Sequence, residues 1–313
     1  MDIFVEIILK AGRSAIELSL FVLLPVMVVM LAIMRLLEAK GILDWLVAKL
    51  SPFLKPFGLT GLGVFAALQV NFVSFAAPVA TLTMMEQRGV SSRHLAATLA
   101  MVMAMAQANA SFPLAALGLH LGQVLLFSIV GGLVAAAMAY HVFGRGLDNQ
   151  EQRIDETLAH PVAENAKGVL NVINRAGAEA FKIAIGAIPM LVLSLVVVKS
   201  LAAAGAVDRL TWVLSPLLLA ANIDPALILP SLTKYLAGGN AMLSVMDTLR
   251  RTEQVSAEVL NLAAGWLIHP LDIPGIAVLI SAGPRVAAIW KPAALGAAVG
   301  IACRTLAHAY LGG

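Results

Sequence analysis

The chain lacks most of the residues and motifs that soluble enzymes use. Its one cysteine, Cys303, excludes an intramolecular disulfide. Only 12% of its 313 residues are charged and 6% are aromatic. It contains no Gly-x4-Gly-Lys-Ser/Thr run, no HExxH and no GxSxG, the motifs of P-loop proteins, zinc proteases and serine hydrolases. We therefore expect neither an enzyme nor a protein with a resident metal or cofactor.

Apolar residues are in excess instead. Hydrophobic residues make up 60% of the sequence, and the mean hydropathy is +0.90, which implies more apolar surface than one soluble core can bury. Apolar runs of roughly 20 residues alternate with short polar connectors, as in membrane-spanning helices, whereas a barrel alternates over about 10 residues. The sequence predicts an all-α, polytopic helical membrane protein.

The chain carries a net positive charge, which has an explanation other than nucleic-acid binding. The net charge is +3 and the isoelectric point is near 9.1. Membrane proteins carry lysine and arginine in their loops to fix their orientation. We expect membrane lipid and a small molecule as partners, and no nucleic acid.

The two halves of the chain repeat each other. Landmarks of the first half recur in the second at one constant offset: Pro25 with Pro189, Gly41 with Gly205, and Leu-Ser-Pro at 50–52 with 214–216. Matched prolines and glycines imply matched backbone bends and hence a structural duplication. A polar, charged segment separates the halves. We predict a first repeat at 1–143, a cytoplasmic linker at 144–174 and a second repeat at 175–313.

Each repeat divides into five pieces. A spanning helix is followed by a short helix with a polar stripe (Asp44, Ser51 and Lys55 in the first repeat), which we expect to lie along the membrane surface. Next comes a segment with two apolar arms around a polar centre, and then two spanning helices. The expected ranges are 14–37, 42–57, 60–88, 94–118 and 120–143 in the first repeat. In the second they are 181–204, a surface helix through Asp208, Thr211 and Ser215, 225–251, 256–282 and 286–311.

The two-armed segments allow two topologies. An arm of about 11 helical residues rises roughly 16 Å, about half of the hydrocarbon thickness. The arms either turn back as a re-entrant hairpin, which makes the repeats inverted, or stack as one broken crossing helix, which makes them parallel. The hairpin puts most lysines and arginines on the side of the linker, as the positive-inside rule requires. We predict two inverted repeats, each with three spanning helices, one interfacial helix and one re-entrant hairpin. Both termini are then external, with Arg304 among the few basic residues on their side.

Polar residues collect where the backbone must leave the helix at membrane depth. Unpaired backbone groups cost several kcal/mol there unless protein, water or a ligand satisfies them. "KYLAGGN" forms the second tip, and "WLIHPLDIPG" must break at its prolines. "VNFVSFAAP" and "AMAQANASFPL" take the same places in the first repeat. These four interrupted elements predict a solute site made of Asn71, Ser74, Gln107, Asn109, Ser111, Lys234, Tyr235, Gly238, Gly239, Asn240, His269 and Asp272.

Several of these residues also have a structural interpretation. A lone charge at mid-depth costs about 2.5–3.5 kcal/mol, so we expect Lys234 to pair with Asp272 or with a solute carboxylate. A purely structural ion pair is the alternative, as is a structural role for His269. Asn71, Ser74, Asn109 and Ser111 are equally well explained as small polar contacts between helices.

The order of spanning helix, surface helix, hairpin, broken helix and helix, present twice, resembles the nucleoside-recognition or Gate domain membrane proteins. The resemblance covers roughly residues 10–311 and is carried by "LDWLVAKLSPFLKPFGLTG" and "VSFAAPVATLTMMEQRGVSSRHL". The family includes spore-maturation membrane proteins and, distantly, the concentrative nucleoside transporters. The Gly-Gln-Thr-Glu tip of those transporters is replaced here by "VNFVSFAAP". The resemblance implies coupling to Na+ or H+, a homo-oligomer and a place in the bacterial cytoplasmic (inner) membrane.

Two functions follow from these patterns. The first is a secondary active transporter of a small polar or anionic solute, nucleoside-like or a carboxylate, coupled to Na+ or H+. Its site lies at mid-membrane between the two hairpin tips and the two broken helices, where Asp272 or His269 would couple a proton or free carbonyls would hold Na+. The alternative is a non-transporting membrane partner or scaffold of the spore-maturation type, in which the interruptions are structural.

Overall fold

The computed structural model describes residues 2–150 and 168–312, which contain helices and no strands. The first repeat opens with a continuous rod made of α1 (Asp2–Glu17), a π-helical turn (Leu18–Leu23) and α2 (Leu24–Ala39). It continues with α3 (Ile42–Leu54), a 3-10 turn (Lys55–Phe57), α4 (Gly61–Phe72), α5 (Pro78–Gln87), α6 (Ser92–Ala104), α7 (Ala108–Ala115), α8 (Leu121–Met138) and a π-helical turn (Ala139–Phe143). The all-α prediction is confirmed.

In its described residues, the second repeat has a similar order of elements, without the π-helical turns and with one additional short helix, α15. Its elements are α9 (Val169–Ala203), α10 (Ala206–Ala220), a 3-10 turn (Pro225–Leu227), α11 (Ile228–Ala237), α12 (Gly239–Arg251), α13 (Ala257–Leu267), α14 (Ile273–Ile280), α15 (Pro284–Ala288) and α16 (Trp290–Leu311). The first helices of both repeats begin earlier than their apolar runs, at Asp2 and Val169. The start of α9 therefore lies in the range that the sequence assigned to the linker, most of which is outside the described residues.

In the described part of the chain, five helices are long and apolar enough to cross a membrane. They are Phe4–Ala39, Ser92–Ala115, Leu121–Phe143, Val169–Ala203 and Trp290–Leu311. The remaining predicted span is divided into α13 and α14 by residues 268–272. The segment Ile42–Phe57 is bent by 103° from α4, as expected of a surface helix that leads into a hairpin. The inverted relation of the repeats and the external termini stay predictions.

Both two-armed segments fold back on themselves. α4 packs against α5, and α11 packs against α12. Between the first pair of arms, the Thr81 hydroxyl donates a hydrogen bond to Gln69 Oε1 at 2.7 Å. A single broken crossing helix would hold such residues far apart along its axis. The structure therefore has the hairpin form, and its re-entrant placement in lipid stays a prediction.

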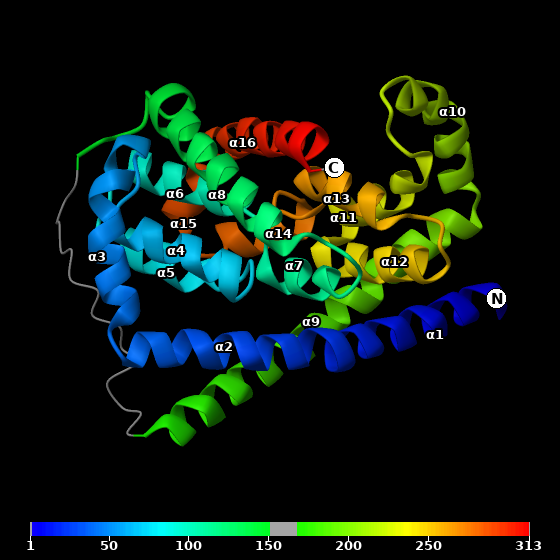
Figure 1. The fold of residues 1–313 in the computed structure, drawn as a ribbon, viewed down its shortest axis with the longest axis horizontal. Helices are drawn as coiled ribbons and strands as arrows, with labels where there is room; N and C mark the ends of the chain where they lie inside the picture. Colours follow the sequence, from blue (N-terminus) through cyan, green and yellow to red (C-terminus); the bar gives the residue numbers. More distant parts are fainter. Residues whose placement is uncertain (1, 151–167, 313) are drawn as a thin grey trace.

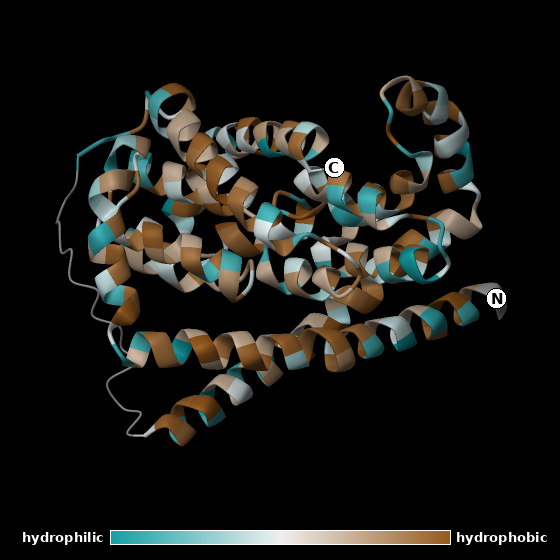
Figure 2. Ribbon diagram, viewed as in Figure 1, coloured by the Kyte–Doolittle hydropathy of each residue, from teal (hydrophilic) through white to brown (hydrophobic). Residues whose placement is uncertain are grey.

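The helices divide into a rod side and a body (Figure 1). The α1–α2 rod runs along one side of the molecule, and α9 crosses it and contacts both of its parts. The hairpins, the broken helices, α8 and α16 form the body. Apolar residues cover the outward sides of the rod and of α9 (Figure 2), where Phe21 and Leu193 are 75% and 65% exposed. Such faces suit contact with lipid.

α8 and α16 approach each other closely at glycines. A Cβ on Gly300 would lie 2.2 Å from the backbone oxygen of Gly131, and a Cβ on Gly296 would lie 2.7 Å from that of Ala135. Gly296 and Gly300 are four positions apart, the small-residue spacing that lets helices pack tightly in lipid. This contact joins α8 to α16 within the body.

Gly300→Ala should destabilise the protein by about 1–3 kcal/mol, because the backbone of α8 has to move away. Thermal unfolding of the detergent-solubilised protein measures this loss. Gly177→Ala in α9 is the control, since its Cβ meets nothing within 4 Å and alanine favours the helix by up to about 1 kcal/mol. Equal stability of Gly300→Ala and wild type would contradict the close approach.

Candidate functional site

A cavity of about 350 Å³ lies between the hairpin tips, the helix breaks and the rod. Its volume is near the lower end of the roughly 300–1,000 Å³ of small-molecule sites. All four interrupted elements contribute: Ser74, Phe75 and Ala76; Gln107 and Asn109; Ala237, Gly238, Gly239 and Asn240; and Asp272 and Pro274. Of the predicted site residues, the structure thus brings Ser74, Gln107, Asn109, Gly238, Gly239, Asn240 and Asp272 to one cavity.

Asn109 connects the two hairpin tips. Its Oδ1 accepts a hydrogen bond from the Phe75 N–H at 3.2 Å, and its Nδ2 donates to Asn240 Oδ1 at 2.6 Å. Asn109 lies in the first turn of α7, directly after the break that follows α6. Because one amide bonds both tips, a displacement of either tip disturbs the other.

Ser74 and Gln107 bring unpaired polar atoms to the cavity. They are 2% and 1% exposed, and Ser74 Oγ and Gln107 Nε2 have no hydrogen-bond partner among the described residues. A buried polar group left unpaired costs about 1–3 kcal/mol. A Cβ on Gly239 would lie 1.8 Å from Gln107 Nε2, so the glycine leaves the space that this amide takes. A bound solute with polar groups can satisfy both atoms.

Asp272 uses its two carboxylate oxygens for two tasks. Oδ1 accepts from the Gly275 N–H at 2.7 Å and caps the start of α14, while Oδ2 pairs with Lys234 Nζ. Lys234 is fully buried in the last turn of α11, where its charge also offsets the negative end of the helix dipole. The structure therefore has the Lys234–Asp272 pair that the sequence predicted, and Lys234 does not line the cavity.

Asn71 and Ser111 take part in hydrogen bonds around the backbone of the first break, and neither lines the cavity. Asn71 Oδ1 accepts from the Ser128 hydroxyl at 2.8 Å, and that hydroxyl oxygen accepts from the Ala106 N–H at 2.7 Å. Ser111 Oγ donates to the carbonyl of Gln107 at 3.0 Å. The bond of Asn71 to Ser128 joins α4 to α8, the kind of contact that the alternative interpretation described, whereas Ser111 bonds within the start of its own helix.

Tyr235 and His269 also lie outside the cavity lining. Tyr235 is 42% exposed and lines a separate apolar cavity of about 320 Å³ between α10 and α11. Its hydroxyl donates to the Trp266 carbonyl at 3.5 Å. His269 is fully buried, and its Nδ1 accepts from the Leu271 N–H at 3.1 Å, within the second break. Tyr235 lies beside the ion pair, with Lys234 Nζ 5.4 Å from its ring centroid, and His269 is part of the break; neither lines the cavity.

Sequence reasoning missed the apolar wall of the cavity. The wall comes from the rod and from α9: Leu23, Met27, Ile183, Ala184, Gly186, Ala187, Met190 and Leu191. Leu23 belongs to the π-helical turn, which precedes Pro25 in the chain, and π-helical turns are frequent at functional sites. The repeat contained a signal for the wall, because Leu23 aligns with Ala187 and Met27 with Leu191 at the offset that relates Pro25 to Pro189.

Arg304 lies deep in the protein, in contrast to its predicted place on the outer side. It is 1% exposed, and its Nη1 donates to the carbonyls of Ala104 at 2.7 Å and Ile268 at 2.8 Å. Ala104 is the last residue of α6 and Ile268 directly follows α13. The topology prediction counted Arg304 with the basic residues of the external face, whereas its side chain reaches inward to two helix ends.

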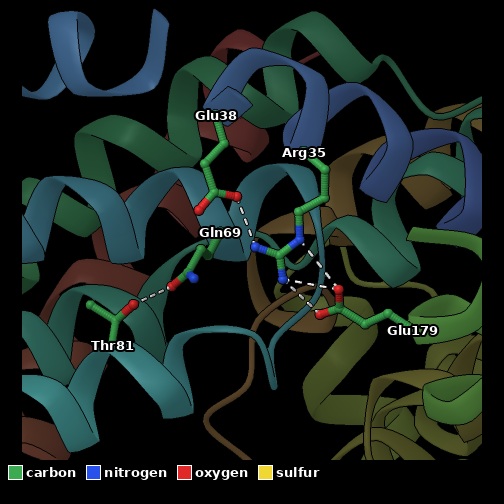
Figure 3. A network of polar contacts seen from close by, with 5 residues as sticks. All are labelled: Arg35, Glu38, Gln69, Thr81 and Glu179. Atoms are coloured by element: carbon green, nitrogen blue, oxygen red, sulfur yellow. Dashed lines mark hydrogen bonds and ion pairs between the residues drawn. The ribbon is translucent and has the colours of Figure 1, made fainter. Parts of the chain in front are cut away.

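A second cavity, of about 250 Å³, lies between the first hairpin, α2 and α9. Arg35 of α2 donates from Nη2 to both carboxylate oxygens of Glu179 in α9, at 3.0 and 2.9 Å, and from Nη1 to Glu38 at 2.8 Å (Figure 3). The Thr81–Gln69 hydrogen bond of the hairpin lies nearby in the same view. Arg35 therefore joins the first spanning helices of the two repeats beside the first hairpin.

Comparisons with known proteins agree with this architecture. Solved structures of the transporter CNTnw match it, among them an inward-facing substrate-bound state, with a TM-score of 0.69 and 16% identity over 99% of this chain and 84% of that chain. A doubly substituted CNTnw in an outward-facing state matches with a TM-score of 0.69 and 18% identity over 93% of this chain and 75% of that chain. No curated protein matches the chain.

The protein is a multi-pass helical membrane protein with the fold of a concentrative nucleoside transporter, and the matched structures are those of a transporter and not of an enzyme. Within it, residues 20–154 match the family model Gate, described as nucleoside recognition. This match agrees with the Gate-domain resemblance found in the sequence. The likeness to CNTnw concerns the fold, and the solute has to be argued from the cavity.

Proposed function

We propose that the protein is a secondary transporter of a small, uncharged polar solute of the nucleoside type. The observation that carries the proposal is the cavity itself, which two hairpin tips and two helix breaks form together. Its unpaired Gln107 amide and Ser74 hydroxyl are suited to a solute with hydroxyl and carbonyl groups. The apolar wall on the rod side suits a flat ring. The Gate match supports the same class of solute.

The charge distribution argues against the carboxylate that the sequence left open. Lys234, the lysine at the second tip, is engaged by Asp272 and does not line the cavity. Asp272 is the acid that does line it. A solute carboxylate would therefore meet a carboxylate in the cavity and have no free lysine to pair with. An uncharged solute avoids this repulsion.

The arrangement of rod and body supports alternating access. The cavity lies where α2 and α9 meet the hairpin tips, so movement of the body against these helices would expose the solute to one side of the membrane and then to the other. The coupling of this movement to an ion, Na+ or H+, belongs to the proposal.

Binding can be tested without knowing the direction of transport. Thermal unfolding of the purified protein with a panel of purine and pyrimidine nucleosides should show stabilisation by at least one of them, because a ligand that binds the folded state raises its stability. Free nucleobases and nucleoside 5′-monophosphates serve as comparison. Uptake of the stabilising nucleoside into proteoliposomes then tests transport. A protein that neither responds to nor moves any nucleoside would refute the proposal.

Gln107→Leu should separate binding from stability. The change removes an amide with an unpaired donor and keeps similar volume, so the free energy of unfolding should stay equal or rise. The loss of one hydrogen bond to the solute should raise Kd about tenfold, which corresponds to about 1.4 kcal/mol. Titration calorimetry with the stabilising nucleoside measures Kd. Gln254→Leu, at an exposed residue, is the matched control. An unchanged Kd in Gln107→Leu would exclude Gln107 from the site.

A further inference from the structure

Arg304 brings a positive charge to the two helix breaks, where α6 and α13 end. One nitrogen, Nη1, is bonded to the carbonyls of Ala104 and Ile268. The first carbonyl closes α6 and the second follows α13, so both belong to the C-terminal ends of half-helices. Such ends carry a partial negative charge of about half an elementary charge. Arg304 therefore faces two negative helix ends at once.

These helix ends are the acceptors that the described chain offers to the guanidinium. Nε and Nη2 of Arg304 have no hydrogen-bond partner among the described residues. The acid near the breaks, Asp272, is engaged by Lys234 and by the Gly275 N–H. In the described residues, Arg304 thus balances the ends of α6 and α13 and not a carboxylate.

α8 leaves room for the arginine to reach this place. A Cβ on Gly131 would lie 3.1 Å from Arg304 Cβ and 3.2 Å from Arg304 Cδ. The glycine thus lets α16 come close enough for the side chain to pass α8 and reach the breaks. The burial of the whole side chain, at 1% exposure, follows from this packing.

We propose that Arg304 is a built-in counter-cation for the two broken helices. Discontinuous membrane helices commonly use their C-terminal ends and unwound carbonyls to hold Na+. Here the guanidinium takes that place at Ala104 and Ile268, so the breaks around the cavity keep their geometry without bound Na+. This role is structural and stands by itself. Its consequence for transport, that Na+ does not couple through these two carbonyls, rests on the proposed function.

The first test compares wild type with Arg304→Gln and uses no solute. Thermal unfolding of both in detergent is measured in sodium chloride and in choline chloride at equal ionic strength. The proposal predicts that Na+ raises the Tm of Arg304→Gln, in which the two carbonyls have lost the guanidinium, by more than it raises the Tm of wild type. An equal effect of Na+ on both proteins would overturn it, because the guanidinium would then not take the place of Na+ at Ala104 and Ile268.

The second test removes the guanidinium and returns it in solution. Arg304→Ala should lower Tm by several degrees, and guanidinium ion far below denaturing concentrations should restore part of this loss, whereas urea, a neutral molecule of the same shape, should not. Arg209→Ala, which removes an exposed arginine, should behave as wild type. Equal responses of Arg304→Ala to guanidinium and urea would reduce Arg304 to a packing role and overturn the proposal.

A conservative pair of variants covers the case in which Arg304→Ala does not fold. Arg304→Lys keeps the charge and should lower Tm less than Arg304→Gln, which keeps polar atoms without the charge. Equal loss in both would overturn the proposal. None of these measurements involves a solute, so a failure of nucleoside binding would refute the proposed function and leave the counter-cation role standing.

Discussion

Lys234→Met is expected to destabilise the protein by about 3–5 kcal/mol, because it leaves the Asp272 carboxylate buried without its partner. The side chains of Lys234 and Asp272 are 0% and 3% exposed, so solvent does not compensate for the lost charge. Asp272→Asn should give a similar loss while sparing the start of α14, since asparagine caps a helix about as well as aspartate. Chemical or thermal unfolding in detergent measures both values.

The double variant Lys234→Met with Asp272→Asn tests whether the two side chains interact or contribute to stability independently. Removing both charges together leaves no buried charge unpaired, so the loss should be smaller than the sum of the single losses. Arg251→Met breaks an exposed pair with Asp247 and should cost under about 1 kcal/mol. Strictly additive losses in the double variant would show that Lys234 and Asp272 do not interact in the folded protein.

Gly275→Ala is expected to damage stability and solute binding together. A Cβ there would lie 2.1 Å from the backbone oxygen of Pro270 and 2.8 Å from Asp272 Oδ1. The backbone oxygen cannot turn away as a flexible side chain can, so the second break must open, at a cost of about 1–3 kcal/mol or more. Asp272 lines the cavity and would move with it. Unfolding and nucleoside titration measure the two effects.

Gly122→Ala is the control for this change. Gly122 lies in the first turn of α8, and a Cβ there meets nothing within 4 Å. Its replacement should leave binding unchanged and stability equal or slightly higher, since alanine favours a helix over glycine. If Gly275→Ala has the stability and the nucleoside affinity of wild type, the tight turn between α13 and α14 is not needed for the site.

Local sequence signals were sufficient for the helical pieces of each repeat. Thr60, Ser91 and Ser256 cap the starts of α4, α6 and α13 with their side chains, and Gly41 and Gly205 adopt left-handed backbone before α3 and α10. Such signals act on neighbours along the chain, so they are readable in one dimension. The starts of α1 and α9 could not be predicted from such signals, because both helices begin before their apolar runs.

Part of the candidate site could also be predicted from local sequence signals. The tips and breaks follow from glycines, prolines and polar residues at membrane depth, and these elements form the cavity. The sequence could not show which polar groups face the cavity. Asn71 and Asn109 look alike in their segments, yet Asn71 is bonded to Ser128, whereas Asn109 bonds both tips.

The sequence by itself determined that this chain is a bundle of membrane helices and where its helices must stop, because apolar runs, prolines and glycines act through the nearest turns of the backbone. Only the tertiary structure decided which groups bond the unpaired backbone atoms where the helices stop. Arg304 meets the carbonyl of Ala104 from 200 positions away, and Leu23 and Leu191 form one wall of the cavity from different repeats. Contacts of this kind depend on how whole helices pack, and packing is a property of the folded molecule.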